Sequence, residues 1–117
     1  MKEVSRKLFE FLTAQSAFTD VIGEIDGVRK LYPIIADSDT PLPFSTYRLR
    51  EQDGETKDCS AYIITLAAYF NDYDQALDFS DAMTPLIKKK YEWFNSEPEY
   101  DEVTSFYISF INFKINN

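Results

Sequence analysis

A long apolar run in the middle of the chain predicts a buried β-strand. Residues 59–70 are almost all apolar or aromatic, several are β-branched, and the run stops at the turn-forming pair Asn71 and Asp72. From residue 61 to residue 70, Thr65 alone lacks an apolar body. A strand with one face open to water alternates apolar and polar residues. We therefore expect this strand to be covered on both faces, by helix, by sheet or by another subunit.

Three other segments place apolar residues at helical spacing. Residues 2–14 predict a first amphipathic helix, and residues 16–22 predict a short second one. A long third helix is predicted from an N-cap at Asp72 to Tyr91. Pro85 lies inside it, where proline removes a backbone hydrogen bond and clashes with the preceding turn. We therefore expect a kink or a break in this helix just before Pro85.

Three further segments have the composition of strands. Residues 28–32 predict a short strand that Pro33 confines to a sheet edge or ends. Residues 44–51 predict a second strand, and residues 103–115 predict a long strand that closes the chain. Together these elements predict one α+β domain over residues 1–117. Its sheet is expected to be single, mostly antiparallel and four-stranded, with two to three helices packed mainly on one face.

Two polar segments predict loops. Residues 52–58 contain Gly54 and lie between two strand patterns, so we expect a hairpin loop that is too long for a tight turn and is mobile. The acidic residues 95–102, around Pro98, predict a second loop. No internal repeat or interdomain linker interrupts the pattern.

The predicted final strand has an apolar row on each face. We expect the helices to cover the row formed by Phe106, Ile108 and Phe110. The opposite row forms an apolar patch larger than isolated monomers usually expose, and we expect it in a contact with another subunit or with a partner protein: Tyr107, Ile111 and Phe113. On this interpretation Ile111→Asp leaves the monomer folded, whereas Ile108→Asp unfolds it by burying an unpaired charge.

The composition argues against several classes of function. Twenty Asp and Glu against twelve Lys and Arg give a formal net charge of -8, which repels a nucleic-acid backbone and disfavours nonspecific binding, and we expect no specific nucleic-acid binding either. No run reaches about 18 apolar residues, so we expect no membrane span. The absence of His removes the usual general base, the Ser-His and Cys-His nucleophile pairs and His-containing metal sites. We therefore expect no enzyme activity, no cofactor and no metal site.

One group of acids suggests a metal site and one cysteine suggests a nucleophile, but each has a simpler structural explanation. One face of the third predicted helix carries three acids at spacings of four and three residues: Asp74, Asp78 and Asp81. They could hold a hard cation, but a solvated helix face is the favoured interpretation. Cys59 has no His partner and follows Asp58, which disfavours a thiolate, so we expect an inert strand residue.

A pair of arginines marks a candidate contact. Arg48 and Arg50 share one face of the strand predicted at residues 44–51. They either pair with acids of their own chain or contact an acidic partner surface. The predicted interface therefore combines these arginines with the apolar row of the final strand.

The order of short motifs along the chain carries a family resemblance. It comprises Ser16-Ala-Phe-Thr-Asp-Val-Ile-Gly23, Arg29-Lys-Leu-Tyr-Pro33, Pro41-Leu-Pro-Phe-Ser-Thr-Tyr47 and the strand that ends in Ala68-Tyr-Phe70. In this order the motifs resemble the small tail-completion proteins, also called tail-terminator or neck proteins, of long-tailed bacteriophages and prophages. The resemblance covers essentially the whole chain. Its most telling segments are Leu-Tyr-Pro and Leu-Pro-Phe.

The resemblance implies a structural role and no catalysis. Members of this family have an α+β fold with helices packed on a sheet. They assemble into a ring, typically a hexamer, that caps the tail tube and joins it to the head connector. The implied partners are copies of this chain, the tail tube and the connector. The implied location is the neck of the virion, after assembly in the host cytoplasm.

Two other classes of function remain open. An acidic binding protein that mimics DNA and occupies a basic partner is the main alternative, and it predicts a monomer with its acids clustered on one convex face. An enzyme that uses a pair of carboxylates comes third, because twenty acids always offer some pair. A ring favours the tail protein. The negative net charge of the chain also suits a ring whose lumen lets DNA slide through without sticking.

Overall fold

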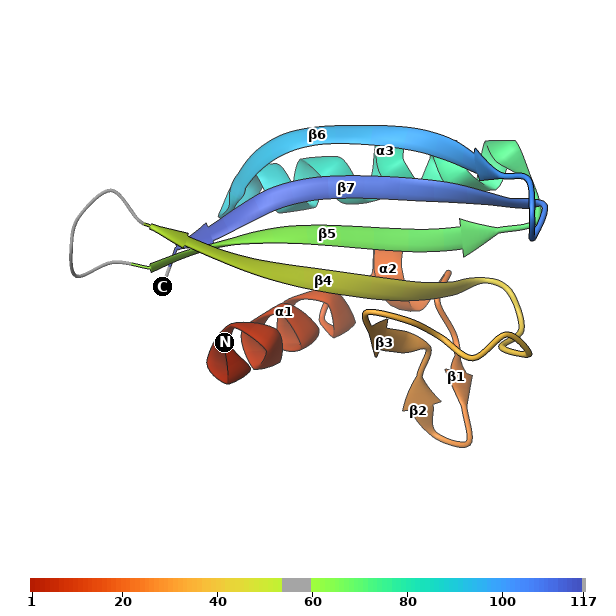
Figure 1. Cartoon of the computed structure of the whole chain (residues 1–117), viewed down its shortest axis with the longest axis horizontal. Coiled ribbons are helices and arrows are strands. Elements are labelled where there is room, and N and C mark those ends of the chain that lie inside the picture. Colours follow the sequence, from red (N-terminus) through yellow and green to blue (C-terminus); the bar gives the residue numbers. More distant parts are fainter. Residues whose placement is uncertain (54–59, 117) are drawn as a thin grey trace.

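The computed structural model describes residues 1–53 and 60–116 (Figure 1). A five-stranded sheet lies at its centre, in the order β3 (Leu31–Pro33), β4 (Phe44–Asp53), β5 (Ser60–Phe70), β7 (Phe106–Asn116) and β6 (Glu92–Asp101). The first pair is parallel and the other pairs are antiparallel. The other described elements are α1 (Lys2–Thr13), α2 (Ser16–Thr19), α3 (Tyr73–Lys90) and the small sheet of β1 (Glu24–Ile25) and β2 (Val28–Arg29). The predicted α+β class is confirmed, but the main sheet has five strands and is mixed.

One face of the main sheet packs against all three helices, and we call it the inner face. On β5 the inner row is Tyr62, Ile64, Leu66, Ala68 and Phe70, all buried in one core with apolar residues of the helices. Figure 1 shows α3 running behind β6 and β7. Within the described residues no helix packs on the opposite face, which we call the outer face. The two faces of the central strand therefore have different neighbours, although both are largely apolar.

A kink or a break is predicted just before Pro85, and the long helix α3 continues through Pro85 without a break. Asp72 is its N-cap, as predicted, and the Gln75 N–H donates to Asp72 Oδ2 at 3.3 Å. The stripe of Ala76, Phe79, Met83 and Ile87 is buried against the sheet. Most helical stability in proteins comes from such packing. Burial of the stripe on both sides of Pro85 therefore offsets the lost backbone hydrogen bond.

Three segments differ from their sequence-based predictions. The residues predicted as an acidic loop around Pro98 form the edge strand β6. Residues 28–32 do not form one strand, because Lys30 separates β2 from β3. Gln52 and Asp53 end β4, while the rest of the predicted loop 52–58 and the predicted strand residue Cys59 lie outside the described residues.

The predicted faces of the final strand are reversed. The register of β7 places Ile111 opposite Leu66 and Phe113 opposite Ile64, which belong to the inner row of β5. Ile111 and Phe113 are both 0% exposed in the helix-covered core. They are therefore unable to form a surface contact, and Ile111→Asp must destabilise the monomer. Phe106, Ile108 and Phe110 lie instead on the outer face.

Candidate functional site

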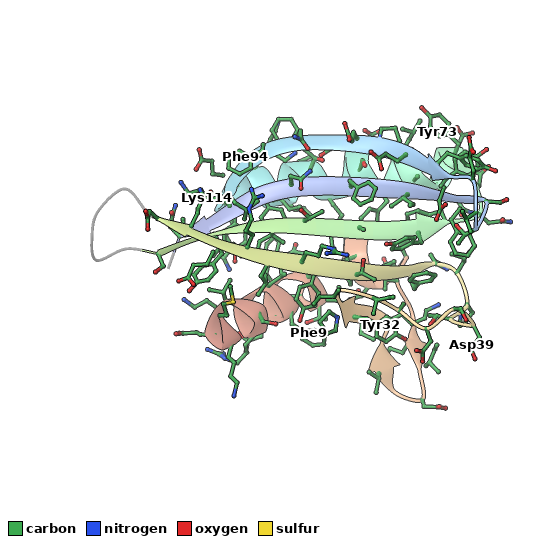
Figure 2. All side chains as sticks on the ribbon, viewed as in Figure 1. Phe9, Tyr32, Asp39, Tyr73, Phe94 and Lys114 are labelled. Carbon is green, nitrogen blue, oxygen red and sulfur yellow. The ribbon has the colours of Figure 1, made fainter. Side chains whose placement is uncertain are left out.

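The outer face of the main sheet is the candidate functional site. Because side chains alternate along a strand, the residues opposite the helix-covered rows all point to this face. The pairing registers place them side by side: Phe44, Thr46, Arg48 and Arg50 on β4, Ile63, Thr65, Ala67 and Tyr69 on β5, Phe106, Ile108, Phe110, Asn112 and Lys114 on β7, and Glu92, Asn95, Glu97, Glu99 and Asp101 on β6. Figure 2 shows side chains projecting across the ribbon of this face.

One end of the outer face is aromatic. The rings of Phe44 and Tyr69 stack with centroids 4.6 Å apart, and Phe106 meets both edge-on at 6.1 and 6.5 Å. Such offset and edge-on pairs add to the stabilisation that burial gives. Ile108 is buried among its neighbours, whereas Tyr69, Phe106 and Phe110 stay partly exposed. The rings of this patch therefore pack against one another within the monomer, and their exposed parts still offer apolar surface to a partner.

A polar chain borders this aromatic patch. Thr65 Oγ1 donates to Asn112 Oδ1 at 2.7 Å, and Asn112 Nδ2 donates to Asn95 Oδ1 at 2.8 Å. These bonds cross from β5 over β7 to β6. Partly buried polar groups on the sheet surface are thereby satisfied.

The two sides of the outer face carry opposite charge. Arg48 and Arg50 are exposed on β4, and within the described residues neither forms an ion pair. Glu97, Glu99 and Asp101 form an acidic row on β6 at the far edge. Both groups share one face of the same sheet, at opposite edges. The face is therefore complementary in charge to a second copy of itself.

The predicted interface residues are divided between the two faces. Arg48 and Arg50 share the outer face as predicted. Tyr107 lies on the inner side, half-buried between Tyr73 and Tyr100 at ring distances of 5.8 and 4.9 Å. Ile111 and Phe113 belong to the core, as described above.

Sequence reasoning missed the aromatic patch and the acidic row. One signal could have identified the outer face, because polar Asn112 and Lys114 alternate with apolar Phe113 and Ile115 near the end of the chain. That alternation continues the two rows of β7, and the polar row is the outer one. The acidic row gave no such signal, since its segment has the composition of a loop.

Two tyrosines on the inner side have altered acidity. Burial raises the pKa of Tyr62, and the negative charge of Glu51 raises it further; the Tyr62 hydroxyl donates to Glu51 Oε1 at 3.3 Å. Burial also raises the pKa of Tyr91, whose ring lies against Phe11 and Phe113 at 5.2 and 5.7 Å. Both groups stay protonated at neutral pH and act through packing and hydrogen bonding.

The acids of α3 show no arrangement for a metal. Asp74, Asp78 and Asp81 are all exposed. Across residues 1–53 and 60–116, no group of three or more His, Cys, Asp or Glu side chains could hold a metal ion. Among the helices described, none is both long and apolar enough to span a membrane.

Comparison of the sequence with models of known protein families gives no match. Comparison with curated proteins gives no match either. The function is therefore argued from the geometry of the outer face and from the motifs of the chain.

Proposed function

We propose that this protein is a structural subunit of a phage or prophage tail. Copies of the chain form a ring, typically a hexamer in the family it resembles, that terminates the tail tube and joins it to the head connector. One observation carries the proposal. The outer face combines an apolar patch with opposite charges at its two edges, and no helix within the described residues packs on it.

The position of the charges favours a head-to-tail contact between sheet edges over a two-fold contact between equivalent edges. A two-fold contact between equivalent sheet edges would bring β4 to β4 or β6 to β6, and would therefore place like charges opposite each other. A head-to-tail contact instead brings the acidic edge of one copy to Arg48 and Arg50 of the next. Repetition of a head-to-tail contact gives a closed ring when the rotation between copies closes.

The most telling motifs lie side by side in the fold. The Leu-Tyr-Pro segment is β3, and the Leu-Pro-Phe segment leads into β4, with which β3 pairs in parallel. Leu31 is paired with Ser45 and Pro33 with Tyr47. These motifs therefore build one edge of the sheet, next to the two arginines. The acidic net charge suits a lumen through which DNA slides.

The proposal is tested by the size and shape of the purified protein. Sedimentation velocity over a range of concentrations measures its mass, and negative-stain electron microscopy at the highest concentration shows its form. We expect a ring of several copies with a central opening. A protein that stays monomeric at every concentration, with no ring in the images, contradicts the proposal.

The acidic row on β6 supports a second candidate function. Glu97, Glu99 and Asp101 lie on one face at regular strand spacing, which gives a line of negative charge that a basic partner could bind. This candidate predicts a monomer that binds a basic DNA-binding protein and is displaced by DNA. Ring formation in the same sedimentation experiment favours the tail protein.

A further inference from the structure

The main sheet has an unpaired backbone at both of its edges. At one edge β3 pairs with β4 only from Ser45 to Tyr47, so within the described part of the chain residues 48–53 have a strand neighbour on one side alone. At the other edge, β6 pairs with β7 and has no second strand neighbour among the described residues. An unpaired strand edge is a template for another strand.

The open part of β4 presents backbone groups that can form hydrogen bonds. The Ser45 N–H donates to Lys30 O, and Tyr47 O accepts from the Ile34 N–H, each at 2.9 Å, so odd-numbered residues of β4 direct their peptide groups towards β3. This direction alternates along a strand. The N–H and C=O groups of Leu49 and Glu51 therefore point out of the sheet. No backbone group within the described residues bonds to them.

A tight turn after β3 keeps this edge open. The Ile35 N–H donates to Pro33 O at 2.7 Å, across Ile34, whose φ of 69° lies in a region that β-branched residues avoid. Pairing of β3 with β4 accordingly stops at Pro33. A hollow of about 670 Å3 follows along β4 and is lined in part by Met1, Ser5 and Ile34. The hollow therefore borders residues 47–50 of β4, and it extends over the outer face, where Ile63, Thr65 and Asn112 also line it.

The edge strand β6 carries charges opposite to those of β4, and it also has backbone groups that face away from the sheet. Its outer row is acidic, and alternation directs the peptide groups of the remaining residues away from β7: Ser96, Pro98 and Tyr100. Pro98 has no N–H to donate, and an outward position on an edge strand is where proline is tolerated. The proline and the charges also discourage pairing with an arbitrary strand. A partner must therefore supply basic side chains and tolerate one missing donor.

We propose that β6 of one copy adds as an antiparallel strand to residues 48–53 of β4 in the next copy. Three successive antiparallel pairings separate β4 from β6 within one sheet, so the two strands run in opposite directions. Two copies in the same orientation therefore meet with these strands antiparallel and their outer faces continuous. The inference rests on the proposed ring and identifies the surfaces that join its subunits.

The position of β3 brings the opposite charges together. Following the pairing across one sheet, Glu97 lies level with Thr46 and Glu99 with Phe44. β3 already occupies the edge at that level. An incoming β6 must therefore shift along the strand towards Arg48 and Arg50, which places its acidic row beside the two arginines. Opposite charges across neighbouring strands stabilise the pairing, and like charges oppose it.

Two charge-reversed variants test the proposed junction. One carries Arg48→Glu with Arg50→Glu, and the other carries Glu97→Lys with Glu99→Lys. Sedimentation velocity should show self-association weaker by roughly tenfold or more for each variant alone, because like charges then meet at every junction. An equimolar mixture should assemble again, because each altered strand now meets an oppositely charged one.

Matched controls distinguish an effect on the junction from an effect of the changed net charge or of misfolding. Arg6→Glu with Lys89→Glu changes the net charge as the first variant does, but on α1 and α3. Asp78→Lys with Asp81→Lys matches the second variant, also on α3. Circular dichroism melts establish that all variants are folded, and we expect both controls to associate like the wild type.

The outcomes distinguish this junction from the proposed ring itself. If the wild type forms a ring and the reversed variants behave like their controls, or their mixture fails to assemble, the strand junction is wrong and the ring proposal stands. A wild type that never self-associates overturns both.

Discussion

The two faces of the main sheet have similar apolar content but different roles. On the inner face, Ile64, Leu66, Ile111 and Phe113 are all 0% exposed beneath the helices. On the outer face the corresponding rows keep Ile63, Tyr69, Phe106 and Phe110 partly exposed. Apolar residues alone therefore do not define the core of a sheet. The inner rows stabilise the monomer, whereas the outer rows leave apolar surface between the two edges at which we propose that copies join.

A charge placed on each face should separate these roles most strongly. Ile111→Asp buries an unpaired carboxylate in the core and should cost about 4 kcal/mol or more, a large part of the stability of a small domain. Phe110→Asp, one residue away on the outer face, should leave a folded monomer because the carboxylate reaches water. Chemical denaturation followed by circular dichroism measures both free energies of unfolding. Equal and severe losses would contradict the assignment of the faces.

Truncation of a ring on each face should give a smaller contrast. Phe113→Ala removes a buried ring and leaves a cavity, at a cost of about 3–5 kcal/mol. Phe106→Ala removes a partly exposed ring from the aromatic patch and should cost about 1–2 kcal/mol. Thermal and urea unfolding of dilute protein measure the two losses. If Phe106→Ala proved the more damaging, the outer patch would be part of the monomer core.

The polar chain across the outer face should contribute less. Thr65→Val removes the donor to Asn112 Oδ1 and should lower the free energy of unfolding by about 1 kcal/mol. Thr65→Ser keeps the hydroxyl and serves as the control for that hydrogen bond. Urea denaturation measures both variants. A Thr65→Val protein as stable as the wild type would show that this bond is replaced by water without cost.

The inner face should also make the protein sensitive to alkali. Because burial raises the pKa of Tyr91 above 10.0, the folded state holds this proton more tightly than the unfolded state. The resulting stability is fully present below pH 10 and is lost as the pH rises through the folded-state pKa. Tyr91→Phe should reduce the loss of stability above pH 10, measured by denaturation at a series of pH values. An unchanged alkaline profile would contradict the pKa shift.

The elements with a strong local signal could be predicted from the sequence. The central apolar run is β5, and the N-cap at Asp72 with its apolar stripe identifies α3. The strand β6 could not be found in this way, because an edge strand needs only one neighbour and its acids and proline resemble a loop. Proline inside a strand pattern normally argues against a strand, and only the edge position removes that objection.

The candidate site required knowledge of the strand registers. Both rows of β7 are apolar near its start, so periodicity alone did not decide which row the helices cover. The pairing of Ile111 with Leu66 decides it. Arg48 and Arg50 could be placed on a common face because they belong to one strand. The row of acids opposite them on β6 depends on contacts between segments far apart in the sequence.

Hydrogen exchange at single amides tests the central claim most directly, because the proposed junction forms new backbone hydrogen bonds at the sheet edges. The N–H groups of Leu49 and Glu51 point out of the monomer sheet, whereas that of Leu66 lies in the paired strand β5 and serves as the internal control. As the concentration rises into the range where copies associate, exchange at Leu49 and Glu51 should slow strongly, while exchange at Leu66 stays slow throughout. Association that leaves the exchange of Leu49 and Glu51 unchanged would contradict the account.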